Sequence, residues 1–178
     1  MSRYPILPSS LYLTERTVLL VGEASADERA SRLADSGATV RRIAGRDYQP
    51  DMCDGVFLVM AQTGERALDR RIAADARSRG ALVYAHDQPD VSDFAMPAVA
   101  ARGPLRIAIA TSATAPGLAR RLRQELDRLL TDAGAALDGL LDALDRERQA
   151  PRSPEREVRL VRLAERLRLT GRIEVEPY

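Results

Sequence analysis

The chain contains no lysine and no tryptophan, and it has a single cysteine and a single histidine. Without lysine, the protein cannot form a Schiff base with a carbonyl substrate, which removes a whole branch of covalent chemistry. Cys53 alone cannot form an internal disulfide, and no Cys/His spacing resembles a zinc site. These absences are typical of a protein of a reducing compartment that has no resident metal.

Aromatic residues, charge imbalance and long apolar runs are also scarce. Aromatic residues make up 4% of the chain, so we expect an aliphatic core and no base-stacking platform. The 27 basic residues, all arginine, nearly balance 26 acidic ones, so the net charge gives no reason to expect nucleic acid as a partner. No run approaches the ~20 apolar residues of a membrane span, and the N-terminus lacks a leader pattern. We therefore expect a soluble, cytoplasmic protein with no membrane partner.

What the sequence does contain is an alternation of short apolar runs and amphipathic stretches. The 178 residues, 45% of them hydrophobic, suit one full domain with an appendage. Glycines follow several of the runs, and apolar residues repeat at i, i+4 and i+8 between Glu65 and Arg79, as in a helix. The alternation predicts an α/β fold with a Rossmann-like doubly wound parallel sheet. Its five expected strands are 17–21, 39–43, 56–61, 82–84 and 106–110.

After Ala115 the pattern becomes entirely helical. Narrow leucine stripes predict helices near 118–131 and 137–144, and a third from Glu155 to Leu169 follows a polar linker. Such stripes on charged helices usually need a partner surface. We divide the chain into a Rossmann-like domain (1–115), a helical region (116–148) and a C-terminal helical segment (149–178). The arginines of the last segment are typical of a solvated face paired with glutamates, and contact with an acidic substrate is the alternative.

Candidate site residues follow two of the expected strands. In an open α/β sheet, ligands bind outside the carboxyl ends of the strands, so Asp87 and the turn 111–115 are expected to face one crevice. Asp87 is the first catalytic candidate, and an N-cap or Asx turn before Pro89 is the alternative. His86 is adjacent, and neighbouring strand residues point to opposite faces. We therefore expect an exposed or structural His86 rather than one that delivers metal or shuttles a proton.

Five short motifs occur in order within about forty residues of this region. Together they resemble the N-terminal module of siroheme synthases, the precorrin-2 dehydrogenase/sirohydrochlorin ferrochelatase family. The motifs are Asp87-Gln88-Pro89, Phe94-Ala95-Met96-Pro97-Ala98, Arg102-Gly103-Pro104-Leu105, Ile107–Thr111 and Pro116–Arg123.

The resemblance implies two activities in one cleft. One is NAD-dependent oxidation of precorrin-2 to sirohydrochlorin, and the other is insertion of a divalent metal, ferrous or cobaltous ion, into sirohydrochlorin. It implies that Asp87 is the general acid/base in both reactions. It also implies that residues 116–148 build a homodimer and close the cleft. Two alternatives stay open: a non-catalytic tetrapyrrole- or metal-binding relative, and a chelatase for another metal.

The resemblance further places the substrate against the turn of Thr111, Ser112, Ala113 and Thr114. Family members carry two glycines in this turn, where Ser112 and Ala113 stand here. The hydroxyls and backbone amides of the turn are suited to bind carboxylates of the tetrapyrrole. A helix N-cap at Thr114 is the alternative, and both roles are compatible because a helix start is itself an anion site.

The residues expected to bind the dinucleotide cofactor depart from the family pattern. A dinucleotide fold needs glycines in the first strand-to-helix turn, and here that turn reads Gly22, Glu23 and Ala24. Glu23 places a carboxylate where a diphosphate docks, so we expect metal insertion to be retained more readily than NAD-dependent oxidation. Thr63, after the third strand, is the further cofactor-side candidate. No acidic residue directly follows the second strand, and Arg46 there favours a 2′-phosphate.

Overall fold

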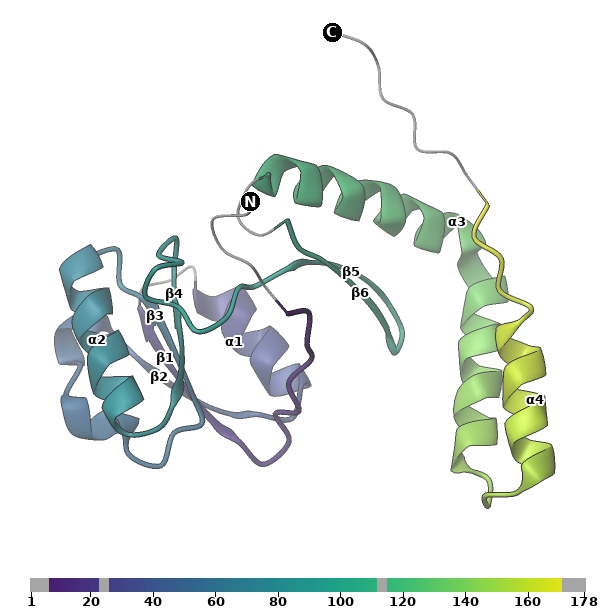
Figure 1. Cartoon of the computed structure of the whole chain (residues 1–178), viewed down its shortest axis with the longest axis horizontal. Helices are drawn as coiled ribbons and strands as arrows, with labels where there is room; N and C mark the ends of the chain where they lie inside the picture. The colour runs from purple at the N-terminus through teal and green to yellow at the C-terminus, as the bar shows by residue number, and fades with distance from the viewer. Residues whose placement is uncertain (1–6, 23–25, 112–114, 171–178) are drawn as a thin grey trace, which may run out of the picture. The chain divides into compact units, whose positions relative to one another are not determined.

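The computed structural model describes residues 7–22, 26–111 and 115–170 of the chain. The chain forms two compact units, one of Met1–Pro97 with Ala110–Pro116 and one of Ala98–Ile109 with Gly117–Tyr178. The first unit contains a four-stranded parallel sheet, and the second contains a two-stranded hairpin followed by helices (Figure 1).

The sheet of the first unit has the strand order β2-β1-β3-β4, and every neighbouring pair is parallel. This arrangement confirms the Rossmann-like doubly wound fold predicted from the sequence. Two short 3₁₀ turns, η1 (Gly45–Asp47) and η2 (Pro50–Cys53), connect β2 to β3. The regular elements are β1 (Thr17–Gly22), α1 (Ala26–Asp35), β2 (Thr39–Ile43), β3 (Leu58–Gln62), α2 (Arg66–Ser78) and β4 (Leu82–Ala85).

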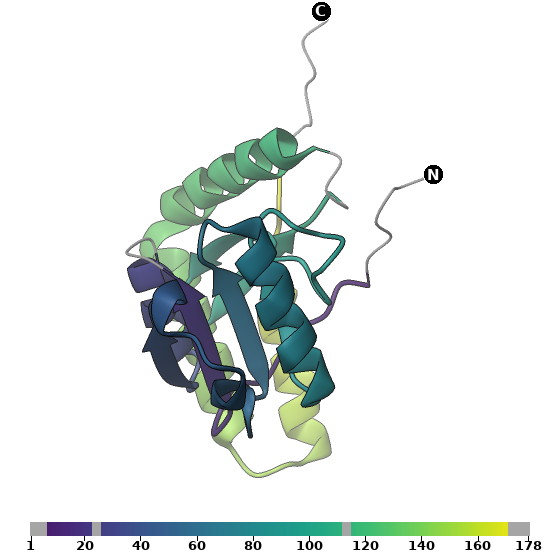
Figure 2. The ribbon, with the colours of Figure 1, turned by 90° about the vertical axis from the view of Figure 1, so that its left-hand side faces the viewer.

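Helices α1 and α2 cover opposite faces of this sheet (Figure 1), and Figure 2 looks onto the sheet from the α2 side. Successive strand residues point to opposite faces, so each central strand contributes to both layers. In β1, Val18 and Leu20 pack toward Leu33 of α1. Leu19 and Val21 pack toward α2. All four β1 side chains are 0–1% exposed, so this strand is the centre of the core.

Gly22 ends β1 where the backbone of β3 passes closely. A Cβ at this position would lie 2.2 Å from the carbonyl oxygen of Gln62, which is a backbone atom and cannot move aside alone. We expect Gly22→Ala to push β1 and β3 apart and to lower the free energy of unfolding by about 1–3 kcal/mol. Urea unfolding measures the change. Gly117→Ala is the control because a Cβ there meets nothing within 4 Å. Equal midpoints for Gly22→Ala and wild type would contradict the expected clash.

The expected fifth parallel strand at 106–110 is wrong. Its residues lie largely in β6 (Leu105–Ile109), which pairs antiparallel with β5 (Ala98–Arg102) in a separate hairpin turned by Gly103 and Pro104. A further parallel strand needs a crossover of about a dozen residues, usually a helix. The residues between β4 and β5 contain only turns and bends, so the chain makes no such crossover.

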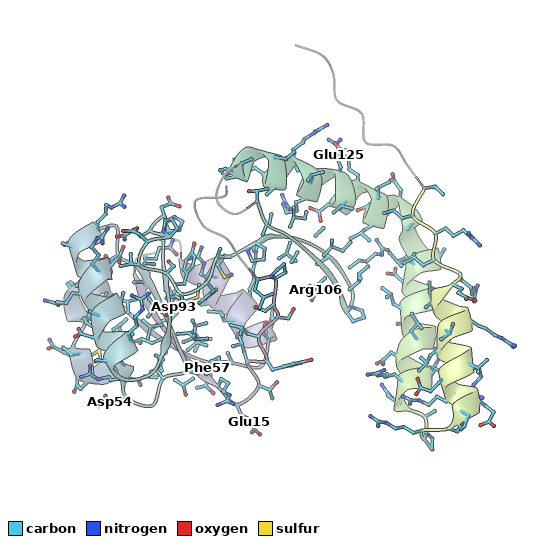
Figure 3. All side chains as sticks on the ribbon, in the orientation of Figure 1. Glu15, Asp54, Phe57, Asp93, Arg106 and Glu125 are labelled. Carbon is cyan, nitrogen blue, oxygen red and sulfur yellow. The ribbon has the colours of Figure 1, made fainter. Side chains whose placement is uncertain are left out.

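The outer edge of β4 is also already covered, which explains why the sheet ends there. The backbone N–H of Val83 donates to Oδ2 of Asp93, and the Asp93 N–H donates to the Val83 carbonyl, both at 2.8 Å. Two residues further along β4, the Ser92 hydroxyl accepts from the N–H of Ala85 at 3.0 Å. The same hydroxyl lies 3.1 Å from the carbonyl oxygen of Ala85. Asp93 is labelled in Figure 3. Polar side chains of a loop thus satisfy the edge that another strand would need.

The second unit carries α3 (Pro116–Gln149) and α4 (Pro154–Ala164). Gly134 has non-helical dihedral angles (φ 48°, ψ −138°) and breaks α3 into the two helices that the sequence predicts. Arg102 of β5 donates two hydrogen bonds to the carboxylate of Asp138, at 2.7 and 2.6 Å, and so ties the hairpin to α3. Helix α4 ends five residues before the predicted end, because Leu167 and Leu169 beyond it are exposed and gain nothing from packing.

Arg156 departs from the expected solvated face of α4. It is 4% exposed, and its guanidinium donates to the carbonyls of Glu147 and Arg148 at 2.9 and 2.6 Å. These carbonyls belong to the C-terminal end of α3, where intrahelical donors run out and the Glu147 carbonyl also accepts from the Ala150 N–H at 3.2 Å. Arg159 does follow the expectation, since it is exposed and pairs with Glu147 at 2.7 Å. Within the described residues, no helix is both long and apolar enough to cross a membrane.

Candidate functional site

The carboxyl ends of the four parallel strands lie along one edge of the sheet, because all four run in the same direction. This edge receives most of the described candidate residues. Gly22 ends β1, Thr63 directly follows β3, and His86 and Asp87 directly follow β4. The side chains that approach this edge all belong to the first unit.

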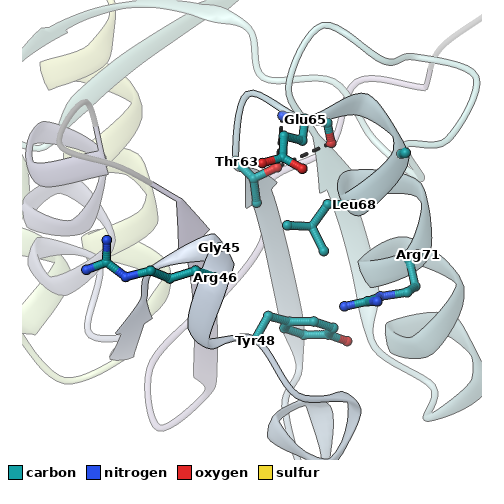
Figure 4. Close-up of a pocket in the computed structure, with 8 residues that line it drawn as sticks. Gly45, Arg46, Tyr48, Thr63, Glu65, Leu68 and Arg71 are labelled. Atoms are coloured by element: carbon teal, nitrogen blue, oxygen red, sulfur yellow. Dashed lines mark hydrogen bonds between the residues drawn. The ribbon is translucent and has the colours of Figure 1, made fainter.

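A pocket of about 570 Å³ opens between the turn after β2 and the start of α2 (Figure 4). Its volume falls within the range of small-molecule sites. Gly45 allows the two walls to approach, because a Cβ there would lie 3.0 Å from the methyl group of Thr63. The lining residues are Gly45, Arg46, Tyr48, Thr63, Glu65, Ala67, Leu68 and Arg71.

Thr63 lines this pocket, but its hydroxyl is committed to the turn that precedes α2. The hydroxyl donates to Oδ1 of Asp69 at 2.8 Å and accepts from the Glu65 N–H at 3.1 Å. The Thr63 N–H donates to the same Asp69 oxygen at 3.1 Å. Thr63 therefore offers a ligand its methyl group and backbone rather than a free hydroxyl. Its predicted role on the cofactor side stays a proposal.

Tyr48 forms another wall of the pocket and is only 3% exposed. Its hydroxyl donates to Oδ2 of Asp75 at 3.1 Å and lies 3.3 Å from Sγ of Cys53. Burial is the main cause that raises the pKa of Tyr48 far above its ordinary value, so the phenol stays protonated. Burial also raises the pKa of Cys53, which is fully buried. Cys53 is therefore a small buried residue with no reactive thiolate.

Asp87 lies just beyond β4 in the left-handed backbone region (φ 53°), which asparagine and aspartate adopt more readily than other non-glycine residues. Its side chain is 86% exposed. Among the described residues, its carboxylate accepts no hydrogen bond from the turn that follows, which disfavours the Asx-turn alternative. The carboxylate is thus accessible to solvent and to a ligand at this edge.

His86 and Asp87 do not point to opposite faces, and the expectation that they would is wrong. The strand ends at Ala85, and the left-handed conformation of Asp87 turns its side chain back toward the imidazole. Nε2 of His86 lies 3.6 Å from Oδ2 of Asp87, and Nδ1 lies 3.3 Å from the Tyr84 hydroxyl. If the phenol donates to Nδ1, the imidazole proton is at Nε2, on the side of the carboxylate.

Tyr84 and Arg29 complete this edge, and their contact is not predicted by the sequence analysis. The Arg29 guanidinium lies 5.3 Å from the centre of the Tyr84 ring, and it donates to Oε1 of Gln62. Burial raises the pKa of Tyr84, and the positive charge of Arg29 opposes that shift. A cation from α1 therefore lies over the ends of β3 and β4. Its only sequence signal is a basic residue in the helix after the first strand.

Several predicted residues lie outside this description. Glu23 and Ala24 of the cofactor turn, and Ser112, Ala113 and Thr114 of the substrate turn, are outside the described residues. Thr111 is half-buried and belongs to the first unit. A single crevice formed by Asp87 and this turn stays a prediction. In the described ranges, no group of three Cys, His, Asp or Glu side chains is placed to hold a metal ion.

Residues 10–98 match the family model described as putative NAD(P)-binding. The siroheme synthase of Gluconacetobacter diazotrophicus is 39% identical over 146 residues, covering 76% of this chain and 30% of that protein. The siroheme synthase of Chromobacterium violaceum is 36% identical over 124 residues, covering 66% and 26%. The chain thus spans a third or less of the length of these relatives.

Among solved structures, the chain is similar to one titled "SirC, precorrin-2 dehydrogenase". The TM-score is 0.70, and the match covers 90% of this chain and 88% of that one. At 20% sequence identity, this likeness shows the shared fold alone. Taken with the family model over half of the chain and the curated relatives, it confirms the resemblance seen in the motifs. The chain belongs to the putative NAD(P)-binding family, as a member of the siroheme synthase N-terminal module family.

Proposed function

We propose that the chain is an enzyme of the siroheme branch of tetrapyrrole metabolism that oxidises precorrin-2 to sirohydrochlorin with a nicotinamide nucleotide. This proposal ranks oxidation ahead of metal insertion, the reverse of the order expected from the Gly22-Glu23-Ala24 turn, because the chain has a pocket of the size that a nucleotide needs. One observation carries the proposal. The exposed Asp87–His86 pair lies at the same sheet edge as a ligand-sized pocket at the ends of β2 and β3. The siroheme synthases among the relatives support the choice of substrate class.

The residues of the pocket fit the adenosine half of a dinucleotide. In doubly wound sheets, this half binds beyond the ends of the first strands, at the edge where the pocket lies. Tyr48, Leu68 and Gly45 would contact the base, and Arg46 and Arg71 would contact ribose and phosphate groups. When bound, an oxidised nicotinamide supplies the hydride acceptor. Gly22 keeps the end of β1 close to β3 at the edge where the diphosphate would pass.

Asp87 acts on the proton that the macrocycle must lose. Oxidation removes a hydride and a proton, and the exposed carboxylate of Asp87 accepts the proton. The imidazole of His86 lies 3.6 Å from this carboxylate. A protonated imidazole stabilises the negative charge of the carboxylate. Both side chains are open to solvent, so the proton can leave the site after each turnover.

An anaerobic assay tests this proposal. Precorrin-2 is mixed with the protein and either NAD⁺ or NADP⁺, and the appearance of sirohydrochlorin is followed by absorbance. We expect oxidation that needs both the protein and one of the two nucleotides. No oxidation with either nucleotide, by a folded protein that binds nucleotide, would contradict the dehydrogenase proposal. Saturable binding of the tetrapyrrole without product would indicate a non-catalytic relative instead.

Metal insertion into sirohydrochlorin is a second candidate function. The Asp87–His86 pair favours it whether or not the pocket binds a nucleotide. Entry of a divalent ion expels two pyrrole N–H protons, and a neighbouring carboxylate and imidazole can each accept one. This reaction needs no dinucleotide, and the metal ion is its substrate. Anaerobic rates with ferrous or cobaltous ion, with and without protein, test it. Equal rates would exclude chelatase activity, and running both assays on one preparation ranks the two activities.

We also propose that the second unit mediates a homodimer. Apolar side chains are exposed along its helices, among them Leu118 and Leu129 of α3 and Val158 and Val161 of α4. A second copy of the chain would cover these side chains and remove them from water. Analytical ultracentrifugation measures the assembly directly. A monomer at micromolar concentration would contradict this part of the proposal.

A further inference from the structure

The end of β2 determines which dinucleotide a Rossmann-like fold accepts. An acidic side chain beyond this strand receives the ribose hydroxyls of NAD, whereas an arginine accommodates the 2′-phosphate of NADP. Here β2 ends at Ile43, and Ala44, Gly45 and Arg46 follow. Asp47, the first acidic residue after β2, does not line the pocket, whereas Arg46 does.

The charged side chains that line the pocket also favour a 2′-phosphate over free ribose hydroxyls. Its lining contains two arginines, Arg46 and Arg71, and one acidic residue, Glu65. Two carboxylates that contact lining residues are already paired with them, because Asp69 accepts from Thr63 and Asp75 accepts from Tyr48. The pocket is therefore a cationic site that lacks the carboxylate expected for a ribose with free hydroxyls.

Arg46 is available to bind an anion. Its side chain is 82% exposed, and Nε lies 3.9 Å from Oδ2 of Asp47, which is itself 63% exposed. This distance is too long for a hydrogen bond, and an exposed pair of this kind is weak. A phosphate offers the guanidinium a bidentate, doubly charged partner in its place.

Arg71 comes from α2, across the pocket from the turn that carries Arg46 (Figure 4). Its guanidinium lies 5.9 Å from the centre of the Tyr48 ring, which is within the range of a cation–π contact. This contact holds the cation at the pocket wall. Arg71 extends from α2 toward Tyr48, whereas the exposed side chain of Arg46 leaves the opposite wall on the side away from α2 (Figure 4).

We propose that this pocket selects a 2′-phosphorylated adenosine, so that the chain takes NADP⁺ in preference to NAD⁺. Arg46 is the main ligand of the 2′-phosphate, and Arg71 adds a second positive charge. This inference rests on the proposed function, because it names which nucleotide occupies the site proposed there.

Binding of two fragments to the full chain isolates the effect of the 2′-phosphate. Adenosine 2′,5′-bisphosphate and 5′-AMP differ only in this group, and isothermal titration calorimetry measures both without any turnover. We expect the bisphosphate to bind about tenfold to a hundredfold more tightly, the range of one or two hydrogen bonds to a charged group. Arg46→Ala should remove most of this difference, because it weakens binding of the bisphosphate far more than binding of 5′-AMP.

Two further variants sharpen the test. Arg46→Glu restores an acidic side chain and should weaken bisphosphate binding further than Arg46→Ala does. Arg41→Ala is the matched control, because Arg41 is an exposed arginine of β2 that does not line the pocket. It should bind both fragments as the wild type does. A similar loss of bisphosphate binding in Arg41→Ala would show a diffuse charge effect and overturn the role of Arg46.

The two proposals fail differently. Equal affinities of the wild type for the two fragments would overturn the preference for NADP⁺ and leave the dehydrogenase proposal standing. If the folded protein binds neither fragment and neither dinucleotide, the pocket is not a nucleotide site, and both proposals fail. Tighter bisphosphate binding that depends on Arg46 supports the inference even if precorrin-2 is not oxidised.

Discussion

Asp87→Asn should lower the rate of precorrin-2 oxidation by about 10²–10⁴-fold, the usual contribution of a positioned general acid or base. Asparagine keeps the shape of the side chain but cannot accept the proton. It also tolerates the left-handed backbone of this position (φ 53°) as well as aspartate does. Because the side chain is 86% exposed, the substitution removes no packing. The thermal unfolding midpoint should therefore match that of the wild type.

The same variant also tests metal insertion, since both reactions are assigned to one carboxylate. His86→Gln is the informative partner, because it removes the imidazole beside Asp87 and leaves the carboxylate in place. We expect a smaller loss than in Asp87→Asn, together with a changed dependence of the rate on pH. Full activity of Asp87→Asn in either assay would exclude Asp87 as the acid/base of that reaction.

Asp69→Ala should destabilise the first unit by about 3 kcal/mol or more, because it leaves one buried and two half-buried donors without their acceptor. Asp69 is 3% exposed and accepts three hydrogen bonds. Two come from the N–H and hydroxyl of Thr63, and the third comes from Nε2 of Gln88 at 3.0 Å. Gln88 is 1% exposed and directly follows Asp87. This carboxylate therefore joins the pocket wall to the segment that carries the proposed acid/base.

Asp69→Asn is the matched variant for this prediction. Its amide oxygen can still accept from Thr63, while its NH₂ group would face the NH₂ group of Gln88. Oε1 of Gln88 is buried without a partner among the described residues, so a flip of the Gln88 amide can accept from Asn. We expect a loss of only about 1–2 kcal/mol. Urea unfolding measures both variants, and wild-type midpoints for both would show that the network does not stabilise the unit.

Most of the first unit could be predicted from the sequence because its signals are local. Apolar runs with glycines beside them define β1 to β4, and their alternation with helices specifies parallel pairing. The failed strand shows the limit of such signals. The run at 105–109 has a strand pattern, but its partner depends on whether the edge of β4 is free. Asp93 and Ser92 cover that edge through side-chain hydrogen bonds that no periodicity reports.

The residues of the candidate site also differ in whether local sequence signals could predict them. Asp87 was predictable because it directly follows a buried strand, and strand ends are where ligands collect. Tyr84 and Arg29 were not, since their contact depends on how α1 packs across the sheet. The contact between His86 and Asp87 depends on one left-handed residue, which the sequence alone does not mark. Arg156 is an arginine that the predicted solvated face misplaces, because it is buried where it donates to backbone carbonyls. Asp69 is likewise buried where it accepts from an amide group, and no local pattern indicates this.

The most direct test of the proposed dehydrogenase is the ratio of reduced nucleotide to sirohydrochlorin formed from precorrin-2 under anaerobic conditions. Oxidation by hydride transfer requires one reduced nucleotide for each macrocycle oxidised. We predict this equality for the wild type with NADP⁺, and almost no product of either kind with Asp87→Asn. Sirohydrochlorin formed without nucleotide reduction, or at the same rate by Asp87→Asn, would contradict the assignment of this site.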